Sequence, residues 1–182
     1  MDDPIARAFL AEARRLLSAD YLPKIERCLE RLGAGGVWWR PNAASNSIGN
    51  LLLHLEGNAR QWIISGVGGA VDRRARQTEF DAGATTDVTE LSLPTAQELI
   101  LRLRATLQEV DEVLAQLDPQ SLLEVRRIQG LSEVAVLTAV FHVVEHFSMH
   151  TGQIIQLTKQ REGGDLGFYD FSGGAPRANW NK

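Results

Sequence analysis

Four stretches of this chain repeat apolar residues every three or four positions, and this pattern limits the possible folds more than any other feature. The stretches cover about residues 4–32, 46–64, 93–117 and 132–160. In each of them the apolar side chains fall on one face of a helix, as a helix that covers a core requires. No run alternates between apolar and polar residues as a half-buried strand would. The sequence therefore predicts an all-α fold, and four amphipathic helices in one domain predict a four-helix bundle.

The ends of the predicted helices carry recognisable signals. Pro23 lies inside the first stretch and predicts a kink or break just before it, followed by a second helical piece. Asn46 and Ser47 are both favourable N-caps for the start of the second helix. Thr95 and Glu98 have the spacing of a capping box at the start of the third helix. Ser132 is the candidate N-cap of the fourth helix, which we expect to end before a pair of glycines.

A polar connector of about residues 70–93 joins the second and third helices and is longer than most loops. The simplest explanation is a crossover that runs the length of the bundle and lets these two helices lie parallel. Three arginines of the connector are interpreted as a solvated group, with an anion site as the less favoured alternative: Arg73, Arg74 and Arg76. We divide the chain into a bundle, residues 1–162, and a C-terminal tail rich in glycine and aromatic residues, 163–182.

Composition argues against several classes of protein. The formal net charge is -4 with a pI near 5.6, whereas proteins that bind duplex nucleic acid usually carry a basic surface. No apolar run reaches the roughly 18–20 residues of a membrane span. The acidic N-terminus does not resemble a secretory signal, and the single Cys28 has no partner for an internal disulfide. We therefore expect a soluble cytoplasmic protein with no nucleic-acid partner and no membrane contact.

The histidines are the strongest functional signal. All four lie on two predicted helices: His54 on the second, and His142, His146 and His150 on the fourth. Residues four apart share one face of a helix, so two imidazoles at that spacing can bind one metal ion. The pairs 142/146 and 146/150 both have this spacing, but His142 and His150 are about 12 Å apart along the axis and cannot share an ion. A metal site is favoured over a hydrogen-bonded histidine cluster.

Three protein ligands would leave one coordination position open to water or substrate, as catalytic sites do. An imidazole-dominated ligand set suits zinc, nickel, iron(II) or copper. Glu145, which precedes a histidine, could accept a hydrogen bond from a ligand, act as a base, or simply be solvated. Gln153, one turn after His150, could orient that ring.

Two segments resemble a known family. The run from His142 to Gln153 resembles the fourth-helix motif of the DinB/YfiT-like superfamily, in which two histidines four residues apart precede a Gly-Gln pair. Residues 50–55, followed by Asn58 and Arg60, look like the second-helix histidine region of that superfamily. The resemblance covers most of the chain, including the long connector. It implies an up-down-down-up bundle with a long crossover between helices two and three, a divalent metal held by three histidines, and a homodimer.

Carried over to this sequence, the resemblance implies three metal ligands: His54, His146 and His150. The expected ion is a divalent transition metal, zinc or nickel before iron or copper. Characterised members are metal-dependent enzymes that use low-molecular-weight thiols, such as thiol S-transferases and a mycothiol-dependent isomerase. Met149 and Thr151 stand where the commoner family pattern has a further histidine and an arginine. This departure leaves the metal triad intact but weakens the transfer of any particular chemistry.

The leading functional hypothesis is a metal-dependent transferase or hydrolase that acts on a small molecule, with a low-molecular-weight thiol as a candidate cosubstrate. The metal would lower the pKa of a bound thiol or water and so generate a nucleophile. Glu145 and His142 are the candidate catalytic residues, as groups that assist proton transfer. The alternative is a non-catalytic, metal-binding or stress-associated dimer. A third reading is an interaction bundle with a histidine cluster and no metal.

Overall fold

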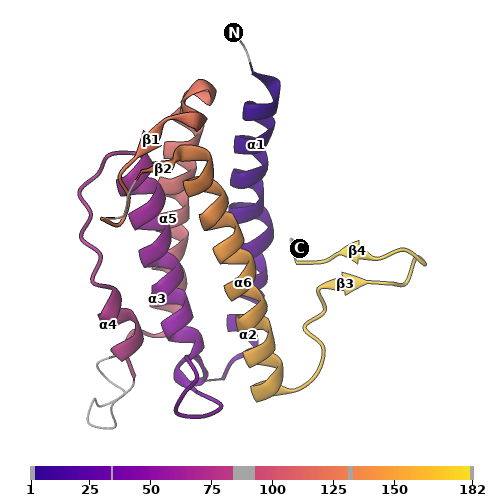
Figure 1. Ribbon diagram of the computed structural model, residues 1–182. Helices are drawn as coiled ribbons and strands as arrows, with labels where there is room; N and C mark the ends of the chain where they lie inside the picture. Colours follow the sequence, from indigo (N-terminus) through magenta and orange to yellow (C-terminus); the bar gives the residue numbers. More distant parts are fainter. Residues whose placement is uncertain (1–2, 34, 84–92, 131–132, 181–182) are drawn as a thin grey trace.

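A computed structural model describes residues 3–33, 35–83, 93–130 and 133–180, and most of these residues are helical. The all-α class predicted from the sequence is confirmed. The long helical segments lie side by side (Figure 1): α3 packs against both α5 and α6, and α2 packs against α6. The α-helices are α1 (Pro4–Arg15), α2 (Leu22–Arg31), α3 (Ile48–Ala59), α4 (Arg76–Asp81), α5 (Ala96–Gln116) and α6 (Val136–Glu162).

Two π-helical segments continue the α-helices that precede them. One is η1 (Leu16–Tyr21), between α1 and α2, and the other is η3 (Arg60–Val67), after α3. The first helical stretch is therefore not broken at Pro23. Instead, the chain changes from π to α geometry just before this proline, which lies in the first turn of α2. Tyr21 and Leu22 keep right-handed helical dihedral angles, so the helix runs on into Pro23. The π segment before the proline changes the hydrogen-bond ladder where the chain reaches a residue with no N–H.

Two of the predicted helix starts are confirmed by their side-chain caps. The hydroxyl of Ser47 accepts from the backbone N–H of Asn50, whose side-chain oxygen accepts from the N–H of Ser47 in return. Thr95 and Glu98 form the same reciprocal arrangement at the start of α5. The third prediction, Ser132, lies outside the described residues. In the described part, α6 begins after Ala135, which forms no side-chain cap.

The core is apolar and continuous between the helices. Its largest fully buried side chains come from several elements, and include Ile25, Leu52, Leu55, Leu103 and Phe147. Hydrophobic burial of this kind is the main stabilising term for helices that are not stable alone. None of the helices in the described ranges combines the length and the hydropathy of a membrane-spanning segment.

The remaining elements are short. They are the 3₁₀ helices η2 (Gly36–Trp38) and η5 (Pro119–Leu123) and the strands β1 (Val125–Arg126), β2 (Val134–Ala135), β3 (Tyr169–Asp170) and β4 (Arg177–Ala178). The strands form two antiparallel pairs, β1 with β2 and β3 with β4. These strands were not predicted, because two residues are too few for an alternating pattern. The β3–β4 hairpin projects beside α6 (Figure 1).

Candidate metal centre

Three of the four histidines meet between α3 and α6. The ring centroid of His54 lies 4.9 Å from that of His146 and 5.2 Å from that of His150. The rings of His146 and His150 are 4.4 Å apart, because residues four apart share one helix face. One ring nitrogen from each histidine lies within 4.8 Å of the other two, a group that could hold a metal ion. The structure therefore brings together the three histidines predicted as ligands.

Nδ1 of His150 has a hydrogen-bond partner, whereas Nε2 of His146 and Nε2 of His150 do not. Nδ1 of His150 lies 2.7 Å from Oε1 of Gln153, so the ring donates from Nδ1 and keeps a free lone pair on Nε2. Within the described chain, Nε2 of His150 and Nε2 of His146 are buried without a hydrogen-bond partner. An unsatisfied buried polar atom costs about 1–3 kcal/mol. A metal ion would remove that cost, and a histidine whose second nitrogen donates to an oxygen is typical of metal ligands.

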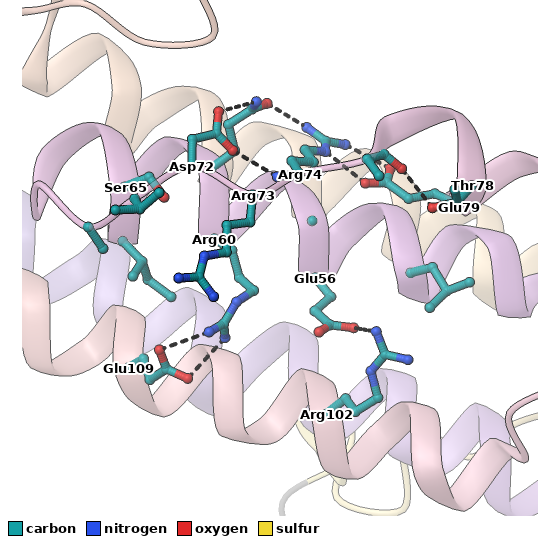
Figure 2. A pocket seen from close by; sticks show the side chains of 17 residues that line it. Glu56, Arg60, Ser65, Asp72, Arg73, Arg74, Thr78, Glu79, Arg102 and Glu109 are labelled. Atoms are coloured by element: carbon teal, nitrogen blue, oxygen red, sulfur yellow. Dashed lines mark hydrogen bonds and ion pairs between the residues drawn. The ribbon is translucent and has the colours of Figure 1, made fainter.

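His54 is held by a buried ion pair that the sequence did not reveal. Its Nδ1 lies 2.8 Å from Oε2 of Glu79, to which a protonated Nδ1 donates, and 3.0 Å from Nη2 of Arg74, which donates to an unprotonated Nδ1. Arg74 donates to the same carboxylate from Nε at 2.7 Å and from Nη2 at 2.9 Å, as the dashed lines in Figure 2 show. The side chains of Arg74 and Glu79 are only 4% and 9% exposed. In the tautomer that donates from Nδ1 to Glu79, the lone pair of His54 is on Nε2, and this nitrogen is then the one left for a metal.

The position of Glu79 follows from its contacts with α3. Nδ2 of Asn50 donates to the backbone carbonyls of Glu79 and Ala82, both at 2.8 Å, and so fastens α4 to the start of α3. Gly57 makes room for the carboxylate, since a Cβ at this position would lie 2.2 Å from Oε1 of Glu79. The connector thus reaches the histidine cluster because one amide side chain holds it and one glycine lets it approach.

The surroundings of the cluster favour the neutral forms of His146 and His150 and the ionised form of Glu79. Burial lowers the pKa of His146 to about 3, and the charges of the neighbouring histidines act in the same direction. Burial also lowers the pKa of His150, against the opposing effect of its hydrogen bond to Gln153. For Glu79, burial opposes ionisation, but the hydrogen bonds from Arg74 and His54 outweigh it and lower the pKa. Neutral imidazole is the form that binds a metal.

His142 and Glu145, the two predicted catalytic residues, lie outside the group of three histidines that could hold a metal ion. The His142 ring stacks on Trp62 at 4.1 Å between centroids and lies 5.3 Å from the ring of His146. Its Nε2 is 3.1 Å from Nδ2 of Asn58. Burial lowers the pKa of His142, whereas the charge of Glu145 raises it. Glu145 itself is exposed, and the group of possible metal ligands does not include it.

The connector arginines do not all behave as predicted. Arg73 and Arg76 are exposed, in keeping with a solvated group, but the interpretation is wrong for Arg74, which is buried against Glu79. Helical periodicity could not reveal this pair. Arg74 precedes α4 and Glu79 lies in it, and this helix of six residues is too short to show a periodic pattern. Among the residues predicted from the sequence, Gln153 does occupy the suggested place beside His150.

Comparison with known proteins identifies the family of this chain. Residues 4–170 match DUF1572, whose description is "protein of unknown function". A search of curated proteins found no match. The matched segment includes the three clustered histidines, both residues of the buried ion pair, and Gln153. The match spans most of the sequence, so the chain belongs to DUF1572, a DinB-like family.

Proposed function

We propose that this protein is a metal-dependent enzyme that acts on a small molecule, with His54, His146 and His150 as the metal ligands. The observation that carries the proposal is the pair of buried, unpartnered Nε2 atoms on His146 and His150 beside a third, firmly oriented histidine. Burial of these atoms is favourable only with a partner, and three converging imidazoles make a divalent transition metal the natural one. Zinc or nickel is proposed before iron or copper.

The residues around the cluster have separable roles in this proposal. Glu79 and Gln153 fix the rings of His54 and His150, so that Nε2 of each points inward. A metal held there would lower the pKa of a water molecule or thiol in its open coordination position. His142 would accept a proton on its ring and donate it again during the reaction. The negative charge of Glu145 favours the protonated form of His142 and would assist this transfer.

The reaction class is a transfer or a hydrolysis, with a low-molecular-weight thiol as the first cosubstrate to test. The resemblance to DinB/YfiT-like proteins supports this choice, because their characterised members use such thiols. The same resemblance supports two further parts of the proposal, the up-down-down-up order of a four-helix bundle and a homodimer. Sedimentation at micromolar concentration tests the homodimer, and a single 20.1 kDa species would contradict it.

A non-catalytic metal site is the second candidate, and the burial of the ligands favours it. His54 and His150 are 5% and 8% exposed, so only His146 offers the ion partial access to solvent. If the metal supports the fold alone, its removal should lower the melting temperature sharply, and no added thiol should perturb the metal spectrum. If the site is catalytic, a thiol should change the spectrum of a cobalt- or nickel-loaded protein.

Metal content is the decisive test. Protein purified without a histidine tag is analysed by mass spectrometry before and after titration with zinc and nickel, and we expect roughly one ion per chain. The variants His54→Ala and His150→Ala should lose the ion. His142→Ala is the matched control, because it removes an imidazole from the same region but not from the triad. Less than about a tenth of an equivalent in the unmodified protein, with none taken up on titration, would refute the proposal.

A further inference from the structure

A separate pocket lies on the other side of the buried ion pair. It has a volume of about 540 Å³ and opens between α3, η3, the segment 70–79 and α5. Small-molecule sites generally measure about 300–1,000 Å³. Glu79 and Arg74 contribute to its wall, but none of the four histidines does. The metal centre therefore does not account for this pocket.

Most charged groups in the pocket already have partners (Figure 2). Glu109 accepts from Arg60, at 2.9 Å for the Nη1–Oε1 contact, and Glu56 forms an ion pair with Arg102 at 2.9 Å. Glu79 is occupied by Arg74, as described above. Each of the three glutamates that line the pocket is therefore paired with an arginine.

Arg73 also lines the pocket but has no acidic partner in the described part of the chain. Its guanidinium forms no hydrogen bond or ion pair with any residue that the structure describes, and Figure 2 shows it directed toward Arg60. Asp72, its neighbour in the chain, points the other way, and its two oxygens accept from the Gln61 side chain at 2.8 Å and from the Arg74 N–H at 3.0 Å. Glu109 neutralises Arg60, and Arg73 adds a second guanidinium on this side that has no carboxylate of its own. An anion between the two guanidinium groups would relieve their repulsion.

The pocket also has an apolar side. Val71 lines it and is 75% exposed, although most aliphatic side chains of this size are buried. Leu53 and Ile64 lie in the same wall and are only partly buried. A ligand with a carbon skeleton would cover these side chains while its charged group faced the arginines.

From this arrangement we propose that the pocket binds a small organic anion, with its carboxylate or phosphate group between Arg73 and Arg60 and its apolar part against Val71. Guanidinium groups suit both kinds of anion, because their N–H groups match two oxygens at once. The site is separate from the metal ligands and does not depend on the proposed metal chemistry. It binds its ligand whether or not an ion is present.

Calorimetric titration with two probes tests the pocket, namely benzoate for a carboxylate and phenyl phosphate for a phosphate. Phenol is the neutral control, because it keeps the aromatic ring and lacks the anionic group. We expect at least one anionic probe to bind with a Kd below about 10 mM, and phenol not to bind in that range. Whichever anion binds more tightly identifies the class of the natural ligand.

The variant Arg73→Ala should weaken binding by about ten-fold or more, since it removes one of two charged contacts. Arg73→Lys should keep part of the affinity. Arg127→Ala is the matched control, because it removes an exposed arginine that does not line the pocket. Arg73 is exposed and unpaired within the described chain, so its removal should leave the thermal melt unchanged. Equal binding by phenol and the anions, no binding of either anion, or full binding by Arg73→Ala would overturn the proposal.

Discussion

Replacing Glu79 by glutamine tests whether the buried ion pair controls the proposed metal centre. The change keeps the size of the side chain but removes its charge, so Nδ1 of His54 loses a carboxylate acceptor and gains at best an amide oxygen. It also leaves Arg74, with a side chain only 4% exposed, without a counter-charge beside the metal ligands. Both effects disfavour a cation between the histidines.

The expected magnitude follows from these two losses. Removing a hydrogen-bonding partner behind a metal ligand typically weakens metal binding by about 10–100-fold, which corresponds to roughly 1.4–2.8 kcal/mol. The metal-free variant should also be less stable by about 1–3 kcal/mol, because the Arg74 side chain is left incompletely paired in the interior. Competition for zinc with a coloured chelator measures the first quantity, and urea unfolding of the chelator-treated protein measures the second.

Glu109→Gln is the matched control, since it makes the same chemical change in an exposed ion pair. Glu109 and Arg60 are 45% and 44% exposed, so solvent screens their attraction and the stability should change by less than about 1 kcal/mol. The zinc affinity of this control should equal that of the unmodified protein. If Glu79→Gln also binds zinc with unchanged affinity, then the carboxylate does not position His54 for a metal, and our reading of the network is wrong.

Three further predictions concern the fold. Leu103 is fully buried on α5, so Leu103→Ala should lower the free energy of unfolding by about 2–5 kcal/mol in urea, whereas Leu101→Ala at a half-exposed position should change it by about 0.5 or less. Burial raises the pKa of the Cys28 thiol to about 11, so a thiol reagent at neutral pH should label it only after denaturation; rapid labelling of the native protein would contradict this. The pKa of His146 is about 3 in the folded chain and about 6.5 when unfolded, so the unfolded state binds more protons between these values. The melting temperature of the chelator-treated protein should therefore fall as the pH drops from 7 to 5, and His146→Gln should flatten the slope.

The sequence predicted those features of the fold that depend on short-range patterns. Ser47 and Thr95 cap helices where expected, because a capping box is complete within four residues. The spacing of His146 and His150 gave their proximity for the same reason. The π-helical segments were not predicted, since a helix with one extra residue in a turn keeps an ordinary helical composition.

The same distinction applies to the proposed metal centre: one part follows from local sequence patterns, and another depends on contacts between distant residues. Its candidate ligands lie on two strongly periodic helices. Residue type and spacing predicted a histidine site but allowed either the 142/146 or the 146/150 pair. The resemblance to DinB/YfiT-like proteins implied the set His54, His146 and His150. Glu79 and Arg74 come from a polar segment whose local sequence is typical of a solvated loop. Their burial is decided by contacts with distant residues of α3, namely the amide of Asn50 and the space left by Gly57. A charged loop that packs against an amide donor and a glycine can therefore supply buried hydrogen-bond partners to a site on neighbouring helices. In this protein the long connector joins two helices and also forms one wall of the proposed metal centre.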